Sequence, residues 1–253
     1  MNIIIHSNKK YIFFLSGFLV IGIIIFEFVL PPNHFLPRPS IALLSIIALF
    51  QDYQLLLNMF SSISAIYFSS IFAGLFIWII RRHLFMNKNI FGFIAISLKW
   101  IARIVPGILL GLFLILWFPN SESSKYILIL FISFTYLFQK AENELKKVNC
   151  EFIDAAVSLG AGKNFIFEKV CWKVIEPALT EALTELHFYL WSILIMFELI
   201  NGGSGLGAVL RSALLYKDLS ALFISVIIIC IIILIGAALI KYLKKKFIFW
   251  SIS

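Results

Sequence analysis

The stretch Ser158–Phe167, which reads SLGAGKNFIF, is the part of the chain most like a nucleotide-binding loop, because two glycines lie beside a lysine. A phosphate-binding loop needs the pattern G-x-x-x-x-G-K-[ST] between a strand and a helix. Counting back from Gly162 and Lys163, the first glycine would fall at Val157, and the magnesium-binding hydroxyl would fall at Asn164. Both positions hold the wrong residue type. The stretch therefore predicts no nucleotide hydrolysis by this chain.

Metal, thiol and hydrolytic chemistry have equally little support in the sequence. Cys150, Cys171 and Cys230 lie far apart and form no CxxC pair, and none of the four histidines has a ligand partner at helical spacing. We therefore expect reduced thiols, no disulfide, no metal site and no cofactor. The loops hold no Ser/His or His/Asp/Glu cluster, so we expect no catalytic residue and no enzyme.

Composition places the chain in a membrane. Its 253 residues are 62% hydrophobic and only 13% charged, and the mean hydropathy is +1.02. A soluble domain carries about 25% charged residues. The net charge of +8 lies mainly in the segments between apolar runs, so it does not indicate nucleic-acid binding. The composition instead predicts an all-α integral membrane protein.

The apolar runs predict the membrane-spanning helices. A bilayer core of about 30 Å takes about 20 apolar residues as helix. Hydropathy alone leaves five or six spans, because three of the runs are short or interrupted by charges. We predict one transmembrane domain over residues 1–253 with six spans, at residues 11–30, 60–80, 95–118, 124–140, 179–201 and 221–241.

Charge distribution favours six spans with both termini in the cytoplasm. With that arrangement, fifteen of the 21 Lys and Arg residues fall on the inner side, four fall outside and two lie within a span. Positive residues favour the cytoplasmic side of a membrane. Five spans would place the basic C-terminal tail outside.

Two smaller patterns concern packing. Ala65, Ser69 and Ala73 recur every four residues in the second span, which lets helix backbones approach closely; we expect ordinary packing within the chain. The run at residues 41–50 follows Pro39, a good helix start, and is too short to span. We expect it to lie along the membrane interface.

Two pairs of charged residues fall near the inner ends of predicted spans three and five. Lys99 and Arg103 are four apart on one helix face, and so are Glu181 and Glu185. At about 1.5 Å per residue, both pairs lie at similar depth near the inner boundary. Two hypotheses follow, which are pairing between spans three and five, or separate snorkelling to the inner headgroups.

The polar segment between spans four and five predicts two helices. Phe152, Ala155, Ala156 and Leu159 fall at i, i+3, i+4 and i+7, which is one helix face. Gly160 is placed as the left-handed residue that ends the first helix. Asn164 is placed to cap a second helix. The segment is therefore expected to form a helix–turn–helix on the cytoplasmic side.

This segment resembles the EAA loop of bacterial ABC-importer permeases, whose pattern is Glu-Ala-Ala, three residues and Gly. Asp154, Ala155, Ala156 and Gly160 match it, with Asp for Glu, and Pro177 matches a later proline. Trp172 and Lys173 depart from the family's Leu-Pro, and we expect the partner to differ there.

Weaker matches flank the loop in the right order and resemble the nitrate/sulfonate/taurine branch of that family. They extend the resemblance over Phe35–Leu243 and include the segments Phe35–Ser40, Leu116–Lys125 and Glu198–Gly207.

The resemblance implies a permease subunit of the bacterial inner membrane that imports a small solute, such as nitrate, a sulfonate, taurine or a vitamin precursor. It implies a homodimer in the lipid bilayer, a cytoplasmic ATPase dimer that hydrolyses ATP, and a periplasmic or lipoprotein solute-binding protein. The alternative function is a secondary transporter or channel not coupled to ATP. The coupling residues implied for the loop are Asp154, Ala155, Ala156, Gly160, Lys163 and Phe165.

A second candidate site lies at the outer end of span five. Glu198 is followed directly by the glycine-rich stretch NGGSGLG. We consider a gate or a receptor contact there, against a turn whose glycines merely reverse the chain. The residues concerned are Glu198, Gly202, Gly203 and Gly205.

Overall fold

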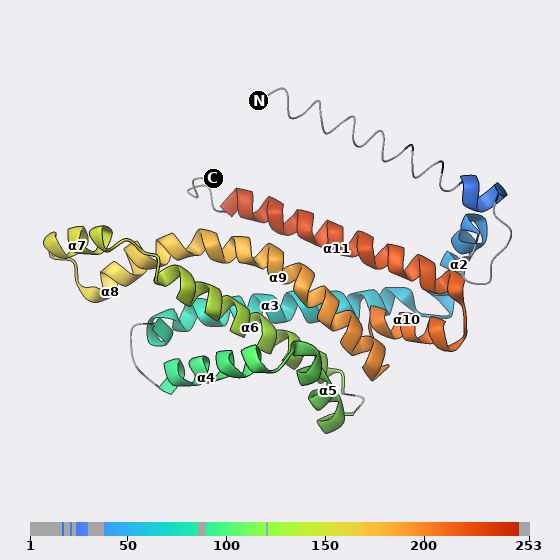
Figure 1. The fold of residues 1–253 in the computed structure, drawn as a ribbon, viewed down its shortest axis with the longest axis horizontal. Coiled ribbons are helices and arrows are strands. Elements are labelled where there is room, and N and C mark those ends of the chain that lie inside the picture. The colour runs from blue at the N-terminus through green and yellow to red at the C-terminus, as the bar shows by residue number, and fades with distance from the viewer. Residues whose placement is uncertain are drawn as a thin grey trace.

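The computed structural model describes residues 17, 21, 24–29, 38–85, 90–119 and 121–247. Within these ranges every regular element is a helix (Figure 1). The all-α prediction is therefore confirmed. The elements are η1 (Ile25–Val29), α2 (Pro39–Gln51), α3 (Leu55–Phe85), α4 (Ile90–Ile104), α5 (Gly107–Trp117), α6 (Ser123–Leu145), α7 (Cys150–Ser158), α8 (Lys163–Ile166), η2 (Phe167–Cys171), α9 (Trp172–Asn201), α10 (Leu206–Leu215) and α11 (Leu219–Phe247).

The long helices run side by side in an elongated bundle. Helix α6 packs against α3, α9, α4 and α5, while α11 packs against α2, α10 and α9. Figure 1 shows α7 and α8 at one end of the bundle and α10 with α2 at the other. We call these the α7 end and the α10 end.

Three described helical stretches are long and apolar enough to cross a membrane: Leu55–His83, Lys163–Asn201 and Leu219–Lys246. They contain the predicted spans 60–80, 179–201 and 221–241, which are thereby confirmed as helices. The predicted span 11–30 lies largely outside the described residues. The total number of spans stays a prediction.

The predicted span at residues 95–118 is not one continuous helix, and its crossing of the membrane stays a prediction. Two helices occupy that run, and Gly92–Ile104 and Gly107–Trp117 are bent from each other by 102°. The break falls at Val105 and Pro106. Proline has no backbone N–H to donate and crowds the preceding turn, while the residue before it avoids the helical conformation.

Helix α6 covers the predicted span 124–140, yet it is more polar than the other long helices. It carries Lys125, Lys140, Glu142 and Glu144. Its central position explains this composition, because Leu128, Ile129 and other residues along it are buried against neighbouring helices rather than exposed to lipid. A hydropathy count therefore gives such a helix a low score as a candidate span.

The two packing predictions can be compared with the structure directly. Ala65, Ser69 and Ala73 are all buried, and Ser69 Oγ donates to the Tyr126 carbonyl on α6 at 3.2 Å. Packing within the chain is therefore confirmed for this stripe. Helix α2 starts at Pro39, as predicted; its position relative to a membrane interface stays a prediction.

Of the two hypotheses for these charges, the pairing of Lys99 and Arg103 with Glu181 and Glu185 is wrong, and snorkelling stays a prediction. Lys99 instead forms an ion pair with Glu142 on α6. Arg103 lies over the Trp100 ring at 5.8 Å. The acidic pair has other partners, since Lys244 contacts Glu181 at 3.3 Å and Tyr136 donates to Glu185 at 2.8 Å.

The helix break explains this difference. The depth estimate assumed a straight third span beside the fifth. In the structure, α4 packs against α6 and α3, so its basic residues meet α6 first.

Candidate functional site

The first candidate site is the α7 loop, residues 146–162. The Asn149 side chain caps α7, accepting from the Glu151 backbone N–H at 3.0 Å. The helix ends at Ser158, and Gly160 follows with φ of +79°. This is the left-handed conformation that glycine adopts without steric cost. The predicted helix and its glycine terminator are confirmed.

The apolar residues of α7 are exposed. No residue of this helix is fully buried. Phe152 is 60% exposed and the following Leu159 is 88% exposed, whereas Ile153 and Ala156 pack toward the core. Helix α7 therefore presents apolar side chains that nothing in the described part of this chain covers. Among the described residues, the exposed carboxylate of Asp154 forms no ion pair.

The second predicted helix is present, but its start is different. Gly162, not Asn164, occupies the N-cap position, and the helix begins at Lys163. It does not stop before the fifth span, because α8, η2 and α9 form one continuous helical stretch to Asn201. Phe165, at its exposed start, lies close along the chain to the α7 loop. A movement of the loop would therefore act directly on a membrane helix.

A charged and aromatic contact joins this long helix to α3. Arg81 Nε donates to Glu168 on η2 at 3.0 Å, and the Arg81 guanidinium lies 5.4 Å from the Trp172 ring centroid. Phe85 stacks near Phe167, with ring centroids 6.5 Å apart. Sequence reasoning missed this contact, because the two segments are separated by more than 80 residues.

The second candidate site, at the α10 end, is a set of hydrogen-bonded residues that we call the glycine-turn cluster. Its centre is Glu198, which is 1% exposed. The Ser62 hydroxyl lies 2.8 Å from both carboxylate oxygens, and the Gly207 N–H donates at 3.0 Å. The members of the cluster are Asn58, Ser61, Ser62, Glu122, Lys125, Glu198, Ser204, Gly205 and Gly207.

Lys125 supplies the buried positive charge of this cluster. It is 2% exposed and donates to the Ser204 hydroxyl at 2.7 Å and to the Ser204 carbonyl at 3.1 Å. It also bonds the Ser61 hydroxyl and pairs with Glu122 at 2.7 Å. Buried charges are tolerated when they are paired and hydrogen-bonded in this way. Sequence reasoning did not assign Lys125 a role.

Backbone conformation and steric contacts explain why glycines occupy this turn. Gly202 ends α9 with φ of +68°, and Gly205 has φ of +127°, a conformation that other residues rarely adopt. A Cβ on Gly205 would overlap the Glu198 carboxylate, and one on Gly207 would overlap the Ile195 carbonyl. Gly203 is exposed beside Glu122. The stretch is thus a tightly bonded turn in this conformation.

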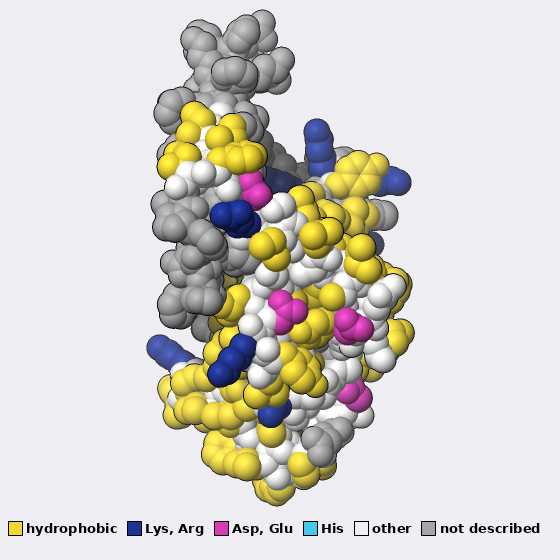
Figure 2. All heavy atoms as spheres, turned by 90° about the vertical axis from the view of Figure 1, so that its right-hand side faces the viewer, with side chains coloured by type: hydrophobic (Ala, Val, Ile, Leu, Met, Phe, Trp, Pro, Cys, Tyr) yellow, Lys and Arg dark blue, Asp and Glu magenta, His cyan; other side chains and the backbone are white. Residues whose placement is uncertain are grey.

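Figure 2 faces the α10 end and shows acidic and basic side chains scattered among apolar ones on the visible surface. Glu198 and Lys125 are buried, so their charges interact with other groups of the cluster and not with solvent. Within the described residues, no three His, Cys, Asp or Glu side chains gather as metal ligands would.

Comparison with known proteins gives a family match over most of the chain. Residues 70–249 match the family described as binding-protein-dependent transport system inner membrane component. That stretch includes both candidate sites apart from Asn58, Ser61 and Ser62 on α3.

Two curated relatives are similar over part of their length. The taurine transport system permease protein TauC of Escherichia coli strain K12 is 32% identical over 152 residues, covering 58% of this chain and 54% of that protein. The putative aliphatic sulfonates transport permease protein SsuC of Bacillus subtilis strain 168 is 26% identical over 155 residues, covering 60% and 55%. The chain spans about half the length of the curated relatives it matches.

The fold is also similar to that of a solved structure. A chain from the inward-facing MetNI methionine ABC transporter aligns with a TM-score of 0.53 at 17% identity, covering 78% of this chain and 96% of that one. At this identity the likeness concerns the fold. With the family match over residues 70–249, it leads to one conclusion: this chain is a member of the binding-protein-dependent transport system inner membrane component family.

Proposed function

We propose that this chain is the transmembrane permease subunit of an ATP-driven importer. A separate pair of cytoplasmic ATPase subunits hydrolyses ATP, and a periplasmic or lipoprotein binding protein delivers the solute. Because each permease chain has one α7 loop, two copies of the chain serve the two ATPase subunits. Both termini of the chain lie in the cytoplasm, as the positive-inside count favours.

The observation that carries this proposal is the uncovered apolar face of α7. Phe152 on α7 and Leu159, which directly follows α7, are exposed at one end of the bundle. Burial of one such side chain is worth about 1.5–3 kcal/mol, so a groove on a partner would gain from covering them. In this arrangement Asp154 pairs with a basic residue of the ATPase. The docking residues are Asp154, Ala155, Ala156, Gly160, Lys163 and Phe165.

The structure of the loop supports its action as a lever. The helix that starts at Lys163 continues to Asn201 as one helical stretch. The Arg81–Glu168 contact ties the same helix to α3. Movement of the loop on ATP binding would therefore move α9 and α3 together, which switches access from one side of the membrane to the other.

At the other end of the bundle, we assign the outer gate to Glu198, Gly202, Gly203 and Gly205. The glycine-turn cluster holds α3, the start of α6 and the α9–α10 turn together in this conformation. Opening on that side would break several of these bonds at once, so the gate has two discrete states.

The transported solute is a small sulfonate. The two relatives are named for taurine transport and for aliphatic sulfonate transport. Their similarity to this chain is the support for this substrate class.

The test of the docking role uses one substitution at two exposed leucines. Leu159→Glu is compared with Leu215→Glu, since Leu215 at the end of α10 is 71% exposed and lies at the opposite end of the bundle. The measurements are co-purification of the ATPase subunit and ATP-driven taurine uptake into proteoliposomes that contain the complex. Leu159→Glu should lose at least about 2 kcal/mol of docking free energy, which weakens the complex roughly 30-fold.

Leu215→Glu should leave the complex intact. Equal retention of the ATPase by both variants would refute docking through α7. Uptake that proceeds without any ATPase subunit would refute the importer itself and favour the secondary transporter.

A further inference from the structure

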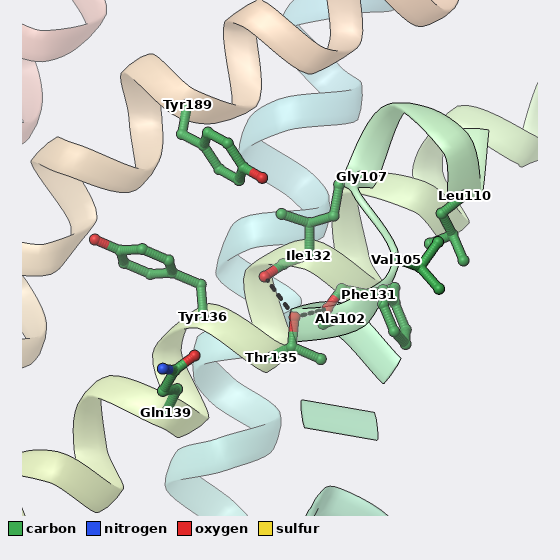
Figure 3. Close-up of a pocket in the computed structure, with 10 residues that line it drawn as sticks. All are labelled: Ala102, Val105, Gly107, Leu110, Phe131, Ile132, Thr135, Tyr136, Gln139 and Tyr189. Carbon is green, nitrogen blue, oxygen red and sulfur yellow. Dashed lines mark hydrogen bonds between the residues drawn. The ribbon is translucent and has the colours of Figure 1, made fainter. Parts of the chain in front are cut away.

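A cavity of about 290 Å³ lies where the α4–α5 pair bends, between the break and the middle of α6 and α9 (Figure 3). We call it the break cavity. Its volume is about ten times the ~30 Å³ that one water molecule occupies, so it has room for a small organic group. None of the residues that line it carries a charge.

The helix break creates this space. Beyond Pro106, α5 turns away from the line of α4 by 102°, so no helical turn continues α4 across the face of α6. Gly107 keeps the space open, since a Cβ there would lie 2.9 Å from Ile193 Cδ1 and 3.2 Å from Ile132 Cδ1. The cavity is therefore built into the backbone path of α4 and α5.

The polar groups of the cavity gather on one side. Figure 3 shows Tyr136, Gln139 and Tyr189 on the side away from Val105. Gln139 is exposed and Tyr189 is 47% exposed, so this polar side opens to the surface of the chain. The opposite side, at Val105 and Leu110, is apolar. The cavity therefore suits a group with one polar end and a short alkyl part.

Glu185 supplies a negative charge at the polar side. Its carboxylate accepts from the Tyr136 hydroxyl at 2.8 Å. It lies one helical turn from Tyr189 on α9, so the two side chains share a helix face. The Glu185 side chain is exposed, and in the described part of the chain it forms no ion pair with a basic residue. Its oxygens therefore keep lone pairs that can accept further hydrogen bonds.

The basic residues near the cavity do not compensate this carboxylate. Lys99 is paired with Glu142 on α6. Arg103 and Lys140 each follow a lining residue in the sequence, but neither lines the cavity, and Arg103 is exposed. Among the described residues, the charged side chain that bonds a lining residue is the Glu185 carboxylate. The cavity therefore favours a cation over an anion.

The remaining polar groups also suit an ammonium ion. The Tyr189 hydroxyl and the Gln139 side-chain amide make no hydrogen bond to other residues in the described part of the chain. Their oxygens can accept from an ammonium group, which donates up to three hydrogen bonds. The rings of Tyr136 and Tyr189 attract a cation through their faces as well. Thr135 is already bonded, since its hydroxyl donates to the Phe131 carbonyl at 2.9 Å.

We propose that the break cavity binds a small alkylammonium group, with Glu185, Gln139 and Tyr189 accepting its hydrogen bonds. The place of this site in transport rests on the proposed function. There it makes the amine the part of the solute that this chain recognises, so taurine, an aminoethanesulfonate, is favoured over an alkanesulfonate without an amine. Glu185 is the specificity-determining residue, because its charge distinguishes an amine from a neutral group of the same size.

The experiment compares two thiol reagents of similar size and opposite charge, (2-aminoethyl)methanethiosulfonate and (2-sulfonatoethyl)methanethiosulfonate. In the full chain, with the three native cysteines replaced by alanine, Val105→Cys places a single cysteine in the cavity lining. The ratio of the two reaction rates is measured in detergent. Glu185→Gln is compared with Glu181→Gln, because Glu181 lies one turn away on α9, is 68% exposed and pairs with Lys244.

Glu185→Gln should lower the ratio of the cationic to the anionic rate about tenfold, because it removes the negative charge beside the cavity. It keeps an oxygen that accepts from Tyr136, so its unfolding temperature should match that of the parent chain. Glu181→Gln should leave the ratio within about twofold, since exposed charges are screened.

Protection by a free amine tests the site directly. Millimolar ethylammonium should slow the cationic reagent at Val105→Cys, whereas methanesulfonate at the same concentration should not. Adding Glu185→Gln should weaken the protection by ethylammonium about tenfold, because a charge-assisted hydrogen bond is lost.

An unchanged ratio in Glu185→Gln, an equal fall in Glu181→Gln or equal protection by methanesulfonate would overturn the ammonium site. Protection by phosphatidylethanolamine without protection by ethylammonium would also overturn it and assign the cavity to a lipid headgroup. ATP-driven taurine uptake by the parent chain is measured with the ATPase subunits present. Uptake without protection by ethylammonium refutes only the ammonium site. Protection without any ATP-driven uptake supports the site and refutes the importer function proposed above.

Discussion

The α7 loop and the glycine-turn cluster differ in how completely their side chains are covered or hydrogen-bonded by other residues of this chain. Helix α7 has no fully buried residue and exposes Phe152 and Leu159. The cluster buries a carboxylate and an ammonium group and supplies each with several hydrogen bonds. Helix α7 leaves apolar side chains uncovered, whereas the cluster satisfies its polar groups within the chain. Substitutions should therefore act on association at the first and on stability at the second.

The largest expected effect comes from adding one methyl group at a glycine of each region. Gly205→Ala places a Cβ inside contact distance of the Glu198 carboxylate at φ of +127°. Gly162→Ala adds the same methyl in open space next to α8. We expect Gly205→Ala to cost about 3 kcal/mol or more and Gly162→Ala less than about 0.5 kcal/mol, measured as thermal unfolding in detergent. Equal unfolding temperatures would remove the distinction between the two regions.

The two ends of α6 offer a second comparison, with ion pairs of identical spacing. Lys125 pairs with Glu122 and its side chain is 3% exposed, while Lys147 pairs with Glu144 and its side chain is 69% exposed. Lys125→Met should lower stability by about 3 kcal/mol because it leaves polar partners buried without their donor. Lys147→Met should change stability by less than about 1 kcal/mol. Denaturant unfolding of both variants checks this, and a similar loss for both would mean that the cluster is hydrated.

The smallest expected effect concerns pH at the rim of the cluster. Burial raises the pKa of Glu122, but the hydrogen bonds from Lys125 and Ser204 outweigh it and lower the pKa below its ordinary value of 4.5. The stabilising contribution of this carboxylate is therefore fully present above that value, and it is lost as the pH falls through the lowered pKa. It should be modest, because the side chain is 54% exposed.

The difference in unfolding temperature between the parent chain and Glu122→Gln should stay constant from pH 7 to about 5 and shrink below that. A difference that changes near neutral pH would assign the titration to another group.

Local sequence rules predicted the structure well where neighbouring residues decide it. The spacing of Phe152 to Leu159 and the glycine at 160 fixed helix α7 and its end, because a helical face and a left-handed terminator depend on a few adjacent residues. Pro39 marked the start of α2 for the same reason. The small residues of α3 predicted close packing, which α6 provides.

Local rules failed where the partner of a residue comes from another helix. Pairing of Lys99 with the acidic residues of α9 was one of two hypotheses, yet α4 packs on α6 and Lys99 pairs with Glu142. Asn164 has a capping side chain, but Gly162, two residues earlier, occupies the N-cap position and the helix begins at Lys163. The dipeptide at Val105 and Pro106 was a signal for the break, although the long apolar run concealed it.

The sequence by itself determined a membrane-embedded helical chain, the family resemblance and the position of the exposed helix α7, since hydropathy and local helix rules need no knowledge of neighbours. Only the tertiary structure decided that Glu198 and Lys125 are buried in one cluster, that Arg81 joins Glu168, and that a cavity opens at Gly107. These features depend on which helices lie side by side. That arrangement results from packing among segments far apart in the sequence, which no local pattern encodes.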